Sequence, residues 1–202
     1  MKVMKFGGTS VGKPQRMQQV ASLVTKDDER KIVVLSALSG TTNALVEISE
    51  SLASGDRSAA KQQIEVLQQH YQHFVLELLQ EAETREKANV VLNEHFEFLT
   101  IILNISFSQA VNKDILAQGE LLSTKLFCIY LEEKKVDHVL LPALDFMTID
   151  SYDEPQVGTI KVKLAQLLNK HKDTNIFVTQ GYISRNAKGE VDNLKRGGSD
   201  YS

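Results

Sequence analysis

A lysine and paired glycines stand near the start of the chain, in the segment Lys5-Phe6-Gly7-Gly8-Thr9-Ser10-Val11-Gly12. The segment follows a short apolar run and precedes an amphipathic helical pattern, so a glycine-rich turn is expected between a strand and a helix. Such a turn directs backbone N–H groups and the helix dipole toward one point, which favours an anion. Lys5 adds a mobile positive charge, and the segment therefore predicts a polyphosphate site.

The glycine spacing differs from that of the two commonest phosphate loops. A Walker loop places its lysine after the glycines, whereas Lys5 precedes them, and Gly7, Gly8 and Gly12 do not follow the pattern G-x-G-x-x-G. Lys5 would therefore reach over the turn from the end of a strand. The alternative interpretation is a tight connection between strand and helix, with Lys5 simply solvated.

Two internal segments carry residues that packing alone does not require. Ser36-Ala37-Leu38-Ser39-Gly40-Thr41-Thr42-Asn43 follows a second apolar run, at the strand end where α/β sheets bind ligands, although N-capping would also explain its hydroxyls. Gly119-Glu120 lies inside a helical pattern from Val111 to Lys134. The glycine predicts either a helix break, with Glu120 on the first turn of a new helix, or a close approach by another segment.

The last eight residues form a further polar motif, Lys195-Arg196-Gly197-Gly198-Ser199-Asp200-Tyr201-Ser202. Paired glycines beside an arginine and an aspartate can present a guanidinium and several N–H donors to an anion. A frayed polar tail is the alternative interpretation.

The elements that must position these residues follow an α/β order. Val3-Met4 and 32–35 read as buried strands on either side of a helix through Met17, Val20 and Val24, which makes a β-α-β unit with a parallel sheet. Residues 41 to about 135 read as a helical excursion. Further strands are expected at 139–141, 147–149 and 176–179, with a helix through Ile160 and Leu168 and a hairpin at 181–194.

Composition excludes several classes of protein. The 202 residues carry a net charge of −3 with scattered lysines, which argues against a nucleic-acid surface, and no run is apolar enough to span a membrane. The only cysteine, Cys128, sits in an apolar pattern that predicts a core position and a reducing, cytoplasmic setting. The five histidines lack partners at metal-ligand spacing, so no zinc site is expected.

Four segments together resemble the signature segments of aspartokinase, in the same order along the chain: KFGGTSVG, SALSGTTN, GELLST and GYISRNAKGEVDNLKRGGSDYS. Aspartokinases belong to the amino-acid kinases, so the resemblance implies a three-layer αβα sandwich with a mainly parallel sheet. It also implies ATP- and Mg²⁺-dependent phosphorylation of the side-chain carboxylate of L-aspartate, the first step of lysine, threonine and methionine biosynthesis, and a homo-oligomer in the full-length protein.

The resemblance also implies roles for individual residues. The phosphates of ATP would bind to Lys5, Phe6, Gly7, Gly8, Thr9 and Ser10. Aspartate would bind to Ser39, Thr42, Glu120, Arg196, Gly197, Gly198 and Ser199. Lys5 and Asp200 would act in catalysis, with Asp200 organising the lysines and the metal. Lys195 and Asp192-Asn193 differ from the family's more usual glycine and threonines.

The chain stops just after the last of these segments, where the family continues with the nucleotide-binding half and regulatory domains. We therefore expect the aspartate-binding N-terminal part of a kinase domain, with little turnover on its own. The open alternatives are another amino-acid kinase, acting on glutamate, acetylglutamate, carbamate or a nucleoside monophosphate, and a non-catalytic domain derived from a kinase. A dinucleotide-binding oxidoreductase fits less well, because the glycine spacing is wrong.

Overall fold

The structure is a computed structural model, and it describes residues 1–194. Its strands are β1 (Lys2–Phe6), β2 (Lys31–Leu35), β3 (Val139–Leu140), β4 (Ile176–Gln180), β5 (Ile183–Arg185) and β6 (Val191–Asn193). Its helices are α1 (Gly8–Val11), α2 (Pro14–Val24), α3 (Thr41–Ala53), α4 (Arg57–Leu78), α5 (Ala82–Ile102), α6 (Gln109–Glu133), α7 (Ala143–Phe146) and α8 (Val157–Lys170).

The main sheet has four strands in the order β1-β2-β4-β3, and every neighbouring pair is parallel. The register aligns the last residues of three strands, since Phe6 pairs with Leu35 and Leu35 with Gln180. The turns that follow β1, β2 and β4 therefore leave the sheet at the same edge, where open parallel sheets bind their ligands.

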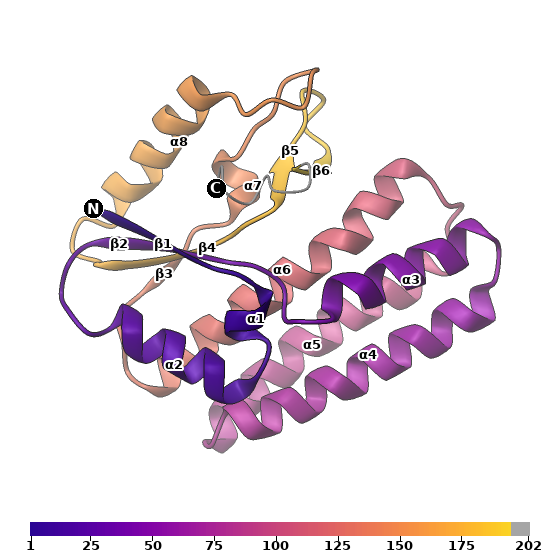
Figure 1. Cartoon of the computed structure of the whole chain (residues 1–202), viewed down its shortest axis with the longest axis horizontal. Helices are drawn as coiled ribbons and strands as arrows, with labels where there is room; N and C mark the ends of the chain where they lie inside the picture. Colours follow the sequence, from indigo (N-terminus) through magenta and orange to yellow (C-terminus); the bar gives the residue numbers. More distant parts are fainter. Residues whose placement is uncertain (195–202) are drawn as a thin grey trace.

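Helices cover both faces of the sheet, as Figure 1 shows, which confirms the predicted three-layer αβα arrangement. Strand residues alternate between two apolar clusters, as the period of a strand requires. Ile32, Val34 and Phe177 face a cluster that includes α7, and residues of α8 pack against it. Val33, Leu35 and Val178 face the larger cluster, which extends into α2 and the four long helices.

The predicted helical excursion consists of the four helices α3 to α6, which lie side by side and extend away from the sheet (Figure 1). An apolar stripe of α4 is buried from Ile64 to Leu78, and one of α5 is buried from Ala88 to Ile102. The predicted hairpin also forms, as the antiparallel pair β5 and β6.

One predicted strand is wrong. Residues 147–149 make only isolated bridges, from Thr148 to Arg185 and from Ile149 to Pro155, and they do not join the main sheet. The short helix α7 turns the chain away from the sheet just before this segment. Pro155, opposite Ile149, has no N–H to continue a ladder.

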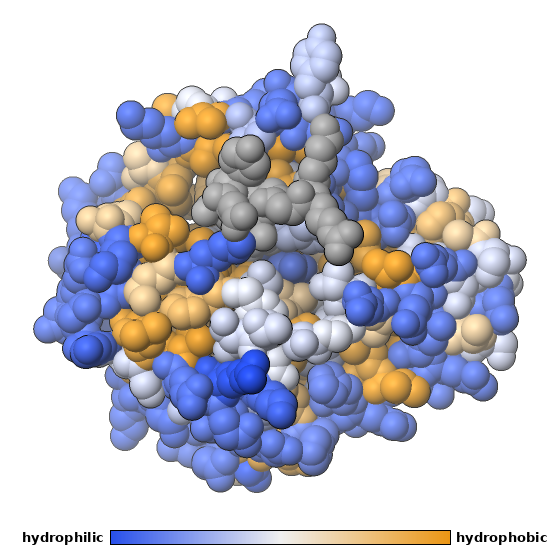
Figure 2. Space-filling model, in the orientation of Figure 1, coloured by the Kyte–Doolittle hydropathy of each residue, from blue (hydrophilic) through white to orange (hydrophobic). Residues whose placement is uncertain are grey.

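The surface of the described part of the chain is mixed in polarity. On the face shown in Figure 2, hydrophilic side chains predominate and apolar residues form separate groups between them. Val3 on β1 and Leu23 on α2 are among the exposed apolar residues of the described chain. Within residues 1–194, no helix combines the length and the apolar character that a membrane crossing requires.

Candidate functional site

The segment after β2 is the centre of the candidate site. It is tied to the end of β1, because the Ser36 N–H donates to the Phe6 carbonyl over 3.1 Å. Ala37 and Leu38 are buried, and Gly40 then turns the chain into α3 with a φ of 86°. This left-handed φ favours glycine, so the sequence Ser-Gly-Thr sets the sharp entry into the helix.

Glycines allow the turn after β1 to lie directly against this segment. A Cβ atom at Gly8 would lie 2.9 Å from the Ala37 carbonyl oxygen, and one at Gly12 would lie 2.4 Å from the Ser39 Cβ. Gly7 differs, because a Cβ there would meet nothing within 4 Å. Gly8 and Gly12 thus permit close packing of two turns, while Gly7 keeps the start of α1 open.

A third glycine brings α6 to the same segment. The helix is continuous through Gly119, so the predicted helix break is wrong and the alternative, a close approach, is correct. A Cβ at Gly119 would lie 2.8 Å from the Ala37 Cβ and 3.2 Å from the Thr41 Cγ2. A glycine inside a helix lowers the stability of that helix, but a larger residue at this position would push α6 away from the β2–α3 segment.

Glu120, the next residue, is only 4% exposed, and its Oε1 accepts a hydrogen bond from the Ala37 N–H over 3.2 Å. Burial raises the pKa of Glu120 to about 7, against the opposing effect of that N–H. Within residues 1–194 no lysine, arginine or histidine pairs with it. A buried carboxylate without a cation is costly, so this position favours a cationic ligand.

Glu120 borders a cavity of about 650 Å³, within the range of small-molecule sites. Gly8 and Thr9 come to it from the first turn, and Ser39 and Thr42 from the second. The structure therefore brings five of the predicted site residues together, from three separate segments. The other residues around the cavity are Ser36, Ala37, Leu38, Gly40, Asn43 and Tyr182.

Tyr182 was not predicted as a site residue. It follows β4 with a φ of 66°, an uncommon conformation for a bulky residue, and its carbonyl accepts a hydrogen bond from the Leu194 N–H over 2.7 Å. Burial and the nearby Glu120 carboxylate raise the pKa of its phenol. The sequence feature that could have identified Tyr182 is the pair Gly181-Tyr182 at the end of a buried strand, a position typical of ligand contacts in such sheets.

The remaining predicted phosphate residues lie around this turn but do not border the cavity. Lys5 is exposed near the end of β1, and Gly7 precedes α1. Phe6 and Ser10 instead border a smaller hollow of about 310 Å³ beside Arg16 of α2. Arg16 also donates to the Thr9 carbonyl over 2.7 Å, which ties the first turn to α2.

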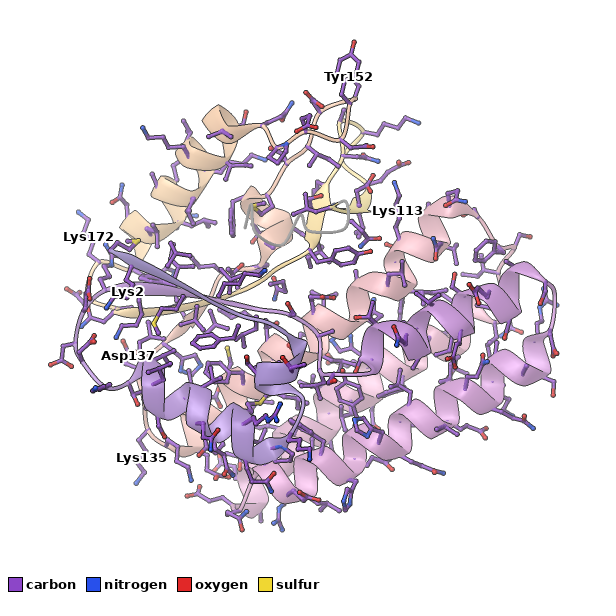
Figure 3. The ribbon with its side chains drawn as sticks, viewed as in Figure 1. Lys2, Lys113, Lys135, Asp137, Tyr152 and Lys172 are labelled. Carbon is purple, nitrogen blue, oxygen red and sulfur yellow. The ribbon has the colours of Figure 1, made fainter. Side chains whose placement is uncertain are left out.

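The predicted residues Arg196, Gly197, Gly198, Ser199 and Asp200 lie outside the described residues. The hairpin that leads to them is fixed to α6, where Lys113 pairs with the buried Asp192 of β6. Figure 3 shows Lys113 on the α6 side of this junction, next to the hairpin.

Among residues 1–194, no group of three histidine, cysteine or acidic side chains could hold a metal ion. His95 is buried between Gln118 and Lys125, which hydrogen-bond its two ring nitrogens. Cys128 is buried, and burial raises the pKa of its thiol. Both therefore belong to the packed interior of α5 and α6.

Comparison with known proteins gives a consistent result. The chain is 32% identical over 203 residues to the lysine-sensitive aspartokinase 3 of Escherichia coli K12, covering 99% of this chain and 44% of that protein. It is 30% identical to the bifunctional aspartokinase/homoserine dehydrogenase 2 of the same organism, covering 98% of this chain and 24% of that protein. The chain thus spans less than half the length of these curated relatives.

Solved structures agree with the sequence relatives. The crystal structure of E. coli aspartokinase III in complex with aspartate and ADP superposes with a TM-score of 0.81 at 32% identity, covering 100% of this chain and 45% of that one. The same enzyme in complex with lysine and aspartate gives a TM-score of 0.83 at 30% identity, with the same coverage. The model of the amino acid kinase family matches residues 1–202. The chain therefore belongs to the amino acid kinase family.

Proposed function

We propose that this chain provides the aspartate-binding part of an aspartate kinase, which transfers the γ-phosphoryl group of ATP to the side-chain carboxylate of L-aspartate. The observation that carries the proposal is the buried Glu120, which pairs with no lysine, arginine or histidine of residues 1–194, at the wall of a cavity of about 650 Å³. The chain also resembles, over its whole length, a structure that holds aspartate and ADP, and this likeness supports the same assignment.

Glu120 is suited to bind the ammonium group of aspartate. The ammonium would supply a cation that residues 1–194 do not bring to this carboxylate, and a charge-assisted hydrogen bond inside a buried site is stronger than one in water. The hydroxyls of Ser39 and Thr42, on the opposite turn, would fix the reach of the side chain. Arg196 to Ser199 complete the proposed site, with the Arg196 guanidinium on the α-carboxylate.

The first turn is suited to the phosphates. Gly7 leaves its surroundings open, and the first turn of a helix offers N–H groups that lack intrahelical partners. Lys5, at the end of β1, would add the positive charge that offsets repulsion between the aspartate carboxylate and the triphosphate. Asp200 is the residue of this chain proposed to hold Mg²⁺, which would supply further positive charge beside the phosphates when bound.

The chemistry needs no general base. A carboxylic acid with an ordinary pKa of about 3.9 is ionised at neutral pH, so an aspartate side-chain oxygen can attack the γ-phosphorus directly. A new P–O bond forms in line as the bond to the β-phosphate oxygen breaks, and ADP leaves with the electron pair. Catalysis by this chain then consists of holding two anions together in the correct geometry.

The test is aspartate-dependent release of ADP by the complete translated product of the gene that encodes this chain. Glu120→Gln should raise the KM for aspartate by about 10- to 100-fold, the loss expected for a hydrogen bond to a charged group, and change the KM for ATP little. Glu132→Gln, an exposed position on the same helix, is the matched control and should behave like the wild type.

A panel of phosphoryl acceptors distinguishes an aspartate kinase from the other amino-acid kinases and from a non-catalytic domain. The same assay with glutamate, acetylglutamate, carbamate and nucleoside monophosphates should give little ADP. A preference for any of these would replace aspartate in the proposal. No turnover with any acceptor, together with binding of aspartate, would instead indicate a non-catalytic domain. We further propose a cytoplasmic homo-oligomer, and sedimentation of the same product would test its oligomeric state.

A further inference from the structure

A second cavity, of about 480 Å³, lies in the groove between α3 and α4. Its apolar wall is made by Ala44 of α3 and by Ala59, Val66 and Leu67 of α4. Its volume is within the usual range for small organic ligands, whose sites combine an apolar lining with a few polar groups. None of these four residues borders the candidate aspartate site.

The polar side chains around this second cavity include a single carboxylate, and the others are the hydroxyls of Ser39 and Thr41, the amides of Gln62 and Gln63 and the imidazole of His70. Glu47 of α3 borders it and forms no ion pair with any residue of the described chain. Gln63 of α4 also borders it, and its buried Oε1 lacks a hydrogen-bond partner among residues 1–194. Neither lysine nor arginine borders the cavity. An N–H donor that carries a positive charge would complement the carboxylate, and it would satisfy the Gln63 carbonyl once that amide turns toward it.

The second cavity shares a wall with the first. Ser39 and Gly40 border both, and the next two residues divide between them, with Thr41 at the second cavity and Thr42 at the first. Thr41 also forms a hydrogen bond with α4, because its hydroxyl oxygen lies 3.0 Å from that of the fully buried Tyr71. A ligand between α3 and α4 would therefore contact the back of the segment that carries Ser39 and Thr42.

From these observations we propose that the α3–α4 cavity is a second ligand site, which binds a small organic cation with an aliphatic body. The body lies on Ala44, Ala59 and Leu67, and the ammonium faces Glu47 and the Gln63 amide. The proposal does not depend on aspartate binding by the first cavity.

The experiment titrates the ¹⁵N-labelled chain with hexylammonium at pH 8 and follows amide chemical shifts. Hexanol and hexanoate serve as neutral and anionic probes of the same length. We expect saturable shifts at Ala44, Ala59 and Leu67, with hexylammonium at least fivefold tighter than hexanol and hexanoate weakest. Shifts at Ser39 and Gly40 should accompany them, because the bound cation lies against their segment.

Variants separate the site from general surface binding. Glu47→Gln should weaken hexylammonium at least fivefold, whereas Glu50→Gln, on an exposed part of the same helix, should have no effect. Ala59→Leu should fill the cavity and abolish the shifts, and Ala53→Leu, at the exposed end of α3, should leave them intact. A thermal melt of each variant verifies that it is folded.

Three results would overturn the proposal. One is equal binding of all three probes, and another is binding that survives Ala59→Leu in a folded chain. The third is a concentration-dependent dimer in sedimentation velocity that Ala59→Leu dissociates, since a second copy of the chain would then occupy the groove. Loss of aspartate turnover by the complete gene product would leave the titration unchanged, so the two proposals fail separately.

Discussion

At the scale of single residues, Glu120 determines how the candidate site responds to pH. With a pKa of about 7, Glu120 is protonated in much of the population at neutral pH. A ligand ammonium requires the ionised carboxylate, so it must bind the deprotonated fraction. Binding and proton release are therefore linked.

We predict that the affinity for L-aspartate falls about tenfold between pH 8 and pH 6, because only about a tenth of Glu120 is ionised at the lower pH. Calorimetric titrations in buffers of different ionisation enthalpy should detect proton release on binding near pH 7. Glu120→Gln should bind weakly with a flat profile. A wild-type affinity that does not change with pH would contradict the role of Glu120.

The pair of hydroxyls on Thr41 and Tyr71 gives a second prediction at this scale. Both residues are buried, and Tyr71→Phe would leave the Thr41 hydroxyl without its partner. We expect a loss of about 1–3 kcal/mol in the free energy of unfolding. We also expect a severalfold higher KM for aspartate, because Thr42 is the next residue.

The double variant Tyr71→Phe/Thr41→Val is the control. Replacing both hydroxyls by apolar groups removes the unsatisfied atom, so urea unfolding should recover part of the loss. If the double variant is less stable than Tyr71→Phe by a full additional increment, the hydrogen bond does not support the segment.

At the scale of elements, local sequence patterns predicted those strands and helices that pack against elements close to them in the sequence. The stripe of α2, through Met17, Val20 and Val24, is buried as its spacing indicates. The pattern at Gly119 could not decide between a break and a close approach, because the deciding atoms belong to Ala37 and Thr41, far away in sequence. The packing role of Gly12 was missed for the same reason.

The start of α5 is stabilised by a side chain of α6. The Glu133 carboxylate, near the end of α6, accepts hydrogen bonds from the N–H groups of Gln80 and Glu81 and from the Thr84 hydroxyl at the start of α5. Burial alone would raise the pKa of Glu133, but these hydrogen bonds outweigh it and lower the pKa to about 2. The carboxylate thus acts as an N-cap supplied by a neighbouring helix.

We predict that Glu133→Gln lowers the free energy of unfolding by about 3 kcal/mol at pH 7, from the difference between the folded and unfolded pKa values. The folded pKa is the lower one, so this stabilisation is complete above the unfolded value and declines as pH falls toward the folded value. Urea unfolding should show the difference shrinking by about half near pH 3. Glu132→Gln, the exposed neighbour, should change stability by less than about 1 kcal/mol at either pH.

At the scale of the whole molecule, one apolar cluster joins the sheet to the helical excursion. It contains Val33 and Val178 from the strands together with Phe96 of α5, and all three are nearly inaccessible to solvent. The cavity proposed for aspartate lies where these two parts meet, since Glu120 comes from α6 and Ser39 from the segment after β2. Sequence patterns located both parts, but the contact between them depends on side chains that only the fold brings together.

Because the cluster is continuous, the helices and the sheet should unfold in one transition. Far-UV circular dichroism and near-UV tyrosine signals should give the same urea midpoint. Phe96→Ala should lower the free energy of unfolding by about 3–5 kcal/mol and move both midpoints together. Val90→Ala, exposed on the same helix, should change it by less than about 0.5 kcal/mol. Two separate midpoints would mean that the helices fold independently, and a mutation in α5 could then leave the sheet side of the cavity intact.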